Sequence, residues 1–199
     1  MAPPNPPLPF SAVLLAGGRS SRMGTDKATL IWAGQPLWQH QLARLQEIQP
    51  AEFFISGKPE RPYAQAGLSI IEDALPDAGP LAGLQAALRF CTLDWLLVLA
   101  VDLPEVPADF LVSLLVAAER TGRGQVPARG DWQQPLAAVY PRTVEPWAEE
   151  CLAAGKRSLR HFVEGAVQRG WVEWREVSER EYGFFRNLNT PTDFSAAQS

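Results

Sequence analysis

The sequence predicts an α/β fold in which a mostly parallel sheet carries helices on both faces. Short, nearly all-apolar runs recur along the first half of the chain, and segments with helical periodicity separate them. Strands of a parallel sheet read as uniformly apolar because helices cover both of its faces. With 199 residues, of which 46% are hydrophobic and 20% charged, the chain can bury a sizeable core in one domain.

The first part of the chain, up to about residue 120, shows this alternation most clearly. The expected strands are residues 10–16, 52–56, 68–72 and 95–101. The expected helices are residues 36–48, 81–90 and 108–120. Pro36 suits the first position of its helix, because proline has no N–H to lose there. The strand at 95–101, WLLVLAV, is the most apolar and should be central in the sheet.

After residue 121 the expected strands and helices alternate less regularly. We expect strands at 136–140 and 171–177 and helices at 144–153 and 158–164, and the chain closes with Asn-Thr-Pro and a short helix. Neither an internal repeat nor a Gly-, Ser- or Pro-rich linker divides the chain. These patterns predict a single Rossmann-like domain over residues 10–195, preceded by a flexible lead at residues 1–9.

Composition excludes several classes of function. A net charge of −4 argues against a general binder of nucleic acids or anionic membranes. The opening MAPPNPPLP has neither the basic nor the apolar region of a signal peptide, and the apolar run 95–101 is too short to span a bilayer. Cys91 and Cys151 lack metal or redox spacing and are expected to be buried thiols. We therefore expect a soluble, cytoplasmic protein.

A glycine-rich, basic loop follows the first strand, in the stretch GGRSSRMGTDK. Ligands of open α/β sheets bind beyond the carboxyl ends of the strands, where this loop lies. Gly17 and Gly18 allow backbone N–H groups to approach a phosphate, and Arg22 and Lys27 can neutralise its charge. A structural turn between strand and helix needs only about 2–6 residues, so this loop is long for that role. The sequence contains neither GxxxxGK[ST] nor GxGxxG, which excludes two common phosphate-binding motifs.

Asp102 ends the most apolar strand and should face the same crevice as the glycine loop. Mg²⁺ binds one or two carboxylates and completes its shell with phosphate oxygens and water, so Asp102 is the candidate metal ligand. A turn or helix-cap role is the alternative for this residue. For Arg22, an ion pair with Asp26 or Asp102 that shapes the loop also stays open.

The string LAGGRSSRMGTDKATL resembles the LAGGxSxRMGxDKxxL signature of the molybdenum cofactor guanylyltransferases, within the nucleotidyltransferase family. Further similar segments follow in the expected order: GQPLWQH, IIEDALPDAGPLAGL, LAVDLPEVPADF and NLNTPTDF. The resemblance runs from about residue 11 to 195, but only QQPLAAVY carries it between about 121 and 180. It implies the fold of the nucleotide-diphospho-sugar transferases.

The resemblance also implies an activity: GMP passes from GTP to the phosphate of molybdenum-molybdopterin, with Mg²⁺ as cofactor and pyrophosphate as product. Residues of about 10–120 would bind the nucleotide, and those of about 121–195 the acceptor. Other molybdenum cofactor biosynthesis proteins and acceptor apoenzymes are the implied partners.

Individual residues take roles from the same resemblance. Nucleotide contacts are implied for Leu15, Ala16, Gly17, Gly18, Lys27, Ser56, Asp73 and Asp102. Catalytic roles are implied for Arg22, Lys27 and Asp102, metal ligation for Asp102, and acceptor contacts for Asn187 and Asn189. Ser56 stands where the family often has asparagine, and a hydroxyl cannot replace both the donor and the acceptor of an amide. For Asp73, a turn or N-cap role remains open.

Three other functions compete with this interpretation. A cytidylyltransferase for the same cofactor, or another NTP transferase, uses the same chemistry, but the cytidylyl relatives more typically read LAAG where this chain reads LAGG. A non-catalytic adaptor could keep the fold alone. A dehydrogenase is compatible only with the fold, and the missing GxGxxG counts against it.

His40 and His161 are interpreted as hydrogen-bonded histidines without a metal, and Trp132 as a ring that closes over the acceptor.

Overall fold

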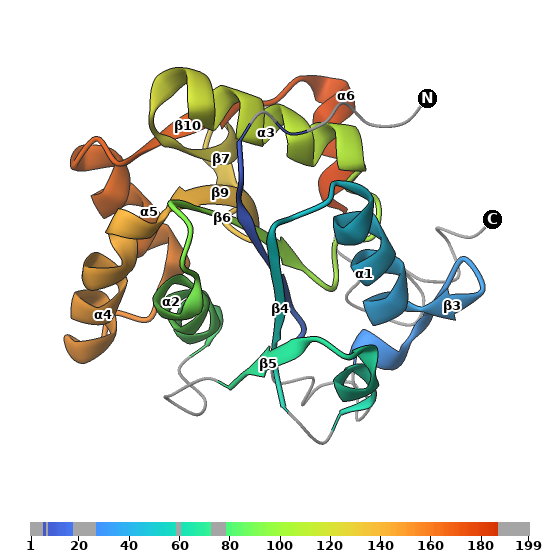
Figure 1. Cartoon of the computed structure of the whole chain (residues 1–199). Coiled ribbons are helices and arrows are strands. Elements are labelled where there is room, and N and C mark those ends of the chain that lie inside the picture. Colours follow the sequence, from blue (N-terminus) through green and yellow to red (C-terminus); the bar gives the residue numbers. More distant parts are fainter. Residues whose placement is uncertain (1–5, 7, 18–26, 59–60, 73–78, 187–199) are drawn as a thin grey trace.

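The computed structural model describes residues 6, 8–17, 27–58, 61–72 and 79–186, which fold around one mixed sheet (Figure 1). The strand order is β10-β7-β9-β6-β1-β4-β5, and a short β8 pairs with β7. The strands are β1 Ser11–Leu15, β4 Glu52–Ser56, β5 Ser69–Ile71, β6 Trp95–Ala100, β7 Gly124–Arg129, β8 Trp132–Gln133, β9 Ala137–Pro141 and β10 Val172–Glu176. A separate hairpin pairs β2 Ile31–Trp32 with β3 Gln35–Pro36.

The sheet is mostly parallel. β1 pairs in parallel with β4 and β6, β4 with β5, and β7 with β10. β9 runs antiparallel to both of its neighbours, β6 and β7. As a result the six strands β1, β4, β5, β6, β7 and β10 have their carboxyl ends at the same edge of the sheet.

Helices cover both faces of the sheet (Figure 1). The helices are α1 Leu37–Glu47, α2 Pro80–Phe90, α3 Ala108–Thr121, α4 Glu145–Ala153, α5 Leu159–Gln168 and the short α6 Glu179–Tyr182. Successive strand residues point to opposite faces. Leu14 and Leu99 accordingly share a core with α1 and α3, whereas Val13 and Val98 share the second core with α2, α4 and α5.

These observations confirm the predicted fold class, and β6 is central as expected. Most element boundaries differ from the prediction by one residue, and the largest difference is at the end of α5. Pro36 is the N-cap of α1 and not its first residue, and α5 continues to Gln168, beyond the expected end at 164. Ser158 caps α5 by accepting a hydrogen bond from the N–H of His161. The β2–β3 hairpin and strands β7 and β8 were not predicted. The closing Asn-Thr-Pro segment and residues 1–5 and 7 lie outside the described residues, and the single-domain division stays a prediction.

Two further predictions concern membrane-spanning helices and the state of the two cysteines. In the described part of the chain no helix has the length and apolarity needed to cross a bilayer. Cys91 and Cys151 are both buried free thiols, as predicted. Burial raises the pKa of Cys91 to about 11, so its thiol is the protonated and unreactive form at neutral pH.

Candidate active site

The order of the strands fixes where a ligand should bind. From β1 the chain adds β4 and β5 on one side, and it then crosses to add β6 on the other side of β1. The crevice beyond the carboxyl ends of β1 and β6 is therefore the topological switch point, the usual ligand site of an open α/β sheet. Leu15 pairs with Ala100 at this end, and the N–H of Val101 donates to the carbonyl of Leu15 at 3.1 Å. Gly17 and Asp102 consequently leave the sheet next to each other.

The start of the glycine loop is fixed by β4. The N–H groups of Ala16 and Gly17 both donate to the carbonyl oxygen of Ser56, at 2.9 and 3.1 Å. The side chains of Leu15 and Ala16 are buried in the core, so their contacts with a nucleotide would be made by the main chain. The Gly17 N–H is already bonded, and phosphate donors would come from the residues that follow it.

Lys27 and Asp102 meet at this crevice, although 75 residues separate them in the chain. Lys27 Nζ lies 3.4 Å from Asp102 Oδ2, and the two side chains are 24% and 27% exposed. An ion pair this close to solvent contributes roughly 0–1 kcal/mol to stability. The pair therefore has little value as a structural link. It brings one cation and one carboxylate to the same point, beyond the carboxyl ends of β1 and β6.

Helix α1 supports the loop of residues 101–107 that carries Asp102. The imidazole of His40 lies between two partners: its Nε2 donates to the carbonyl of Pro104 at 3.2 Å, and Gln35 Nε2 lies 3.5 Å from its Nδ1. Burial lowers the pKa of His40, although the bond to Pro104 acts in the opposite direction. A guanidinium nitrogen of Arg44 donates to the carbonyl of Val106 at 2.9 Å. The interpretation of His40 as a hydrogen-bonded residue is confirmed. For His161 it is wrong, because its Nε2 is buried with no hydrogen-bond partner among the described residues.

A second close contact, between Tyr63 and Gly57, lies next to Ser56. Tyr63 is buried, its hydroxyl accepts a hydrogen bond from the N–H of Lys58 at 2.8 Å, and its ring covers Gly57. A Cβ added to Gly57 would lie 2.7 Å from Cζ of that ring. No side chain larger than hydrogen fits there without displacing the tyrosine. This contact fixes the loop that follows β4.

We therefore expect Gly57→Ala to lower the free energy of unfolding by about 1–3 kcal/mol, because the added methyl overpacks the contact with Tyr63. Gly183→Ala is the matched control: a Cβ at that position meets nothing within 4 Å, and the backbone φ is −59°. It should leave stability unchanged or raise it by about 0.4–1 kcal/mol. Urea denaturation of both variants measures the difference. Equal losses in the two proteins would contradict the packing argument.

A cavity lies at the same edge of the sheet, beyond β7 and β10. Its volume is about 290 Å³, and residues of β7, β8, β10 and α5 line it. Asp131, Glu164 and Glu176 supply carboxylates, and Trp132 and Trp174 supply indole rings. The cavity belongs to the half of the chain that was predicted to bind the acceptor.

Trp132 has two roles in the structure. Besides lining the cavity, its ring packs against those of Tyr182 and Phe185, with centroid separations of 4.8 and 5.0 Å. The ring is therefore held by the segment that leads towards the carboxyl terminus. Closure of this ring over an acceptor stays a prediction.

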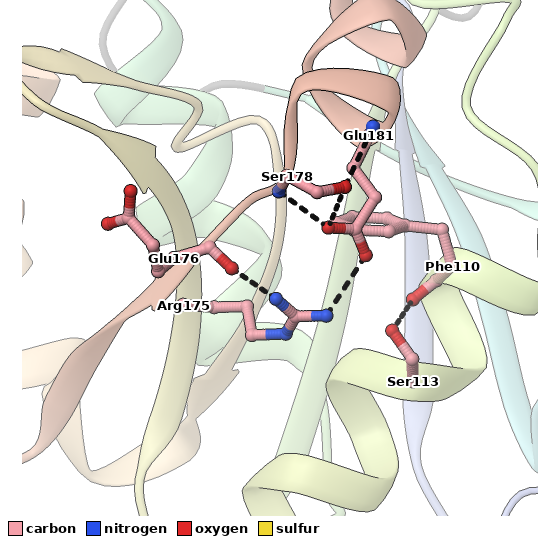
Figure 2. A network of polar contacts seen from close by, with 6 residues as sticks. All are labelled: Phe110, Ser113, Arg175, Glu176, Ser178 and Glu181. Atoms are coloured by element: carbon pink, nitrogen blue, oxygen red, sulfur yellow. Dashed lines mark hydrogen bonds and ion pairs between the residues drawn. The ribbon is translucent and has the colours of Figure 1, made fainter.

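The segment after β10 is anchored by the polar network of Figure 2. Ser178 and Glu181 form a capping box at the start of α6, in which each side chain accepts from the other residue's N–H. Arg175 donates to the second carboxylate oxygen of Glu181 at 3.0 Å. Burial alone would raise the pKa of Glu181, but the bonds from Ser178 and the charge of Arg175 lower it overall. Glu181 is thus held as a carboxylate.

Beyond α6 the chain returns to the Asp102 loop. The ring of Phe185 packs on Phe110 of α3 at 5.3 Å, and Arg186 Nε lies 3.9 Å from a carboxylate oxygen of Glu105. Arg186 is the last described residue, and Asn187 follows it directly.

Five of the predicted site residues lie outside the described residues, and their roles stay predictions: Gly18, Arg22, Asp73, Asn187 and Asn189. Of the rest, the structure brings Gly17, Lys27 and Asp102 to the switch point. Among the described residues no three His, Cys, Asp or Glu side chains gather as a metal site. The α1 contacts with the Asp102 loop were missed. The signal available for them was the set of polar residues at positions 40, 41 and 44, which share one face of a helix.

Comparison with known families agrees with this geometry. The model of the family described as "MobA-like NTP transferase domain" matches residues 12–170. The chain belongs to the MobA-like NTP transferase family. The match includes nearly all of β1, the Asp102 loop and strands β7 and β9, and it ends just before β10.

Relatives of this MobA-like chain carry a consistent description. A probable molybdenum cofactor guanylyltransferase of Opitutus terrae is 36% identical over 187 residues, with 92% of each chain covered. A molybdenum cofactor guanylyltransferase of Pseudomonas fluorescens is 40% identical over 190 residues, covering 93% of this chain and 92% of its own. Among solved structures, molybdopterin-guanine dinucleotide biosynthesis protein A of Archaeoglobus fulgidus superposes with a TM-score of 0.73 and 25% identity, covering 94% of this chain and 96% of its own.

Proposed function

We propose that this protein is a molybdenum cofactor guanylyltransferase, which transfers GMP from GTP to the phosphate of molybdenum-molybdopterin and releases pyrophosphate. The observation that carries the proposal is the pairing of Lys27 with Asp102 at the switch point, next to the start of the glycine loop. The names of the relatives that match nearly the whole chain support the choice of substrates.

In this reaction the protein has mainly to align the two reactants and to stabilise their negative charge. The acceptor's phosphate is anionic at neutral pH and can attack the α-phosphorus of GTP without a general base. Two anions must approach each other, so positioning and electrostatic stabilisation are the main contributions. Lys27, and by prediction Arg22, offset the charge that grows on the departing pyrophosphate. Gly17 and Gly18 would bring the backbone close to the phosphates.

Mg²⁺ fits the donors that the site provides. Asp102 offers a hard carboxylate oxygen on a side chain that is 27% exposed, beside the cation that would face the phosphates. Mg²⁺ needs few protein ligands, because phosphates and water complete its octahedron. A single carboxylate at the switch point is therefore sufficient. When bound, the metal would supply Lewis-acid polarisation of the phosphate.

We further propose that residues of about 10–120 bind the nucleotide, with contacts from Ser56 and Asp73, and that residues of about 121–195 bind the acceptor. The cavity beyond β7 and β10 lies at the same edge of the sheet as Asp102, and its indole rings, not its carboxylates, support the second assignment. Arg186 beside Glu105 brings the chain back to the active-site loop immediately before Asn187, which supports acceptor contacts by Asn187 and Asn189. Acceptor apoenzymes and other proteins of molybdenum cofactor biosynthesis are the partners that this activity implies.

The proposal is tested by incubating the purified protein with molybdenum-molybdopterin, Mg²⁺ and each of GTP, CTP, ATP and UTP in turn. We expect pyrophosphate and the guanine dinucleotide from GTP, and little product from the other nucleotides. Dinucleotide formed preferentially from CTP would identify a cytidylyltransferase. Nucleotide binding without pyrophosphate release from any of the four would identify an adaptor that has kept the fold.

A further inference from the structure

The loop that carries Asp102 has few strong hydrogen bonds of its own. It connects β6 to α3 without regular structure. Within it the N–H of Leu103 lies 3.4 Å from the carbonyl of Ala100, and the N–H of Val106 lies 3.3 Å from the carbonyl of Leu103. Both distances exceed the usual 2.9–3.0 Å of N–H···O bonds. Something outside the loop must hold Asp102 in place.

Gln41 of α1 provides that support. Its side chain is completely buried, and its Nε2 donates to the carbonyl of Ala100 at 3.1 Å and to that of Leu103 at 2.9 Å. These carbonyls belong to residues on either side of the Val101–Asp102 pair. The amide nitrogen must face them, because an amide oxygen would meet two other acceptors. In addition to the sheet bond from Val101 to Leu15, this one side chain holds a backbone carbonyl on each side of Asp102.

The environment of Gln41 indicates that donating these two hydrogen bonds is the role of its side-chain amide. Its Oε1 is buried and finds no hydrogen-bond partner among the described residues. A buried polar atom without a partner is destabilising, and an unbranched apolar side chain would fill the same space without that cost. The amide is therefore explained by its two donors and not by packing.

We propose that Gln41 is a positioning residue that sets the direction of the Asp102 carboxylate. The proposal rests on the proposed function, in which that carboxylate holds the metal of a bound nucleotide. By fixing the carbonyls of Ala100 and Leu103, Gln41 keeps Asp102 at its 3.4 Å distance from Lys27. His40 and Arg44 bind the far end of the same loop, so loss of Gln41 should loosen the Asp102 end without releasing the whole segment.

The test compares two buried glutamines. Gln41→Met keeps the length of the side chain and removes both donors. Gln125→Met is the matched control, since Gln125 is also buried and its Nε2 donates to Thr121, Arg123 and Glu173, away from the crevice. For Gln41→Met we expect kcat to fall about 10–100-fold and the Mg²⁺ concentration for half-maximal rate to rise about tenfold, as for other residues that orient a metal ligand. Its KM for GTP should change by less than about threefold, and Gln125→Met should keep kcat within about twofold.

A second readout does not depend on activity. Hydrogen exchange of the loop amides of Asp102, Leu103, Glu105 and Val106 should accelerate at least about tenfold in Gln41→Met and stay unchanged in Gln125→Met, because only the first variant frees the loop. If the wild-type protein releases no pyrophosphate from GTP, the proposed function fails, and the exchange rates still decide the role of Gln41.

Two results would overturn the role of Gln41: unchanged exchange at these four loop amides, or fast exchange together with a normal kcat and a normal Mg²⁺ requirement. Should Gln41→Met not fold, Gln41→Leu is measured in its place, because leucine is also apolar, has no hydrogen-bond donor and buries no charge.

Discussion

Asp102→Asn is expected to reduce the rate of guanylate transfer by about 10³-fold or more, since a metal held at this carboxylate stabilises the transition state by several kcal/mol. The asparagine has the same shape but no charge, and a neutral amide is a poor ligand for Mg²⁺. The fold should survive, because the ion pair with Lys27 is partly exposed and contributes little to stability. Pyrophosphate release at saturating GTP and Mg²⁺ measures the first effect, and thermal unfolding the second.

Asp109→Asn is the control for this prediction. Asp109 lies in the first turn of α3, seven residues after Asp102, and its side chain is exposed. The substitution removes the same charge from the same region, and activity should stay within about twofold because surface changes away from the site are usually small. An Asp102→Asn protein that transfers guanylate with Mg²⁺ at a near-normal rate would refute the metal assignment.

Most of the fold could be predicted because the strands of its first half are short, apolar and clearly bounded. Runs such as WLLVLAV do not depend on distant partners to be recognised as strands. The reversed direction of β9 could not be predicted from LAAVY, which is apolar throughout and compatible with either orientation. Its direction depends on pairing with β6 and β7.

Strand β7 shows why the strands in the second half of the chain were harder to predict from the sequence. Its sequence GQVPAR contains a polar residue and a proline, and neither suggests a buried strand. Gln125 is nevertheless buried, because Thr121, Arg123 and Glu173 all accept hydrogen bonds from its amide. Glu173 lies 48 residues away on β10. The strand is therefore defined by partners that no local pattern contains.

In the candidate site, too, some residues could be predicted from the sequence and others could not. Gly17 and Asp102 were predicted to share a crevice because each follows a buried strand, and the β1–β6 pairing brings them there. The role of Gln41 follows from hydrogen bonds to backbone carbonyls, which leave no mark in the sequence of the loop. A polar residue within the buried stripe of α1 was the one signal for it.

Lys27→Met is expected to weaken GTP binding and to slow transfer, each by about 10–100-fold, since a hydrogen bond to a charged group contributes about 1.5–3 kcal/mol. Without Lys27, the charge of the triphosphate would face the carboxylate of Asp102 with no cation beside it. Lys27→Arg keeps the charge and should recover binding better than the rate, because a planar guanidinium cannot place its donors where a single ammonium does. Calorimetry with GTP and Mg²⁺ measures binding, and pyrophosphate release measures the rate.

Arg89→Met separates this local effect from that of net charge. Arg89 lies in the last turn of α2, where its side chain is 71% exposed and 3.9 Å from a carboxylate oxygen of Glu149. It removes one positive charge, as Lys27→Met does, but away from the switch point. Charges on the surface beyond about 8–10 Å are screened at physiological salt, so GTP affinity should be unchanged in this variant. If the two variants lost affinity equally, or if neither did, the phosphates would bind somewhere other than the crevice between β1 and β6.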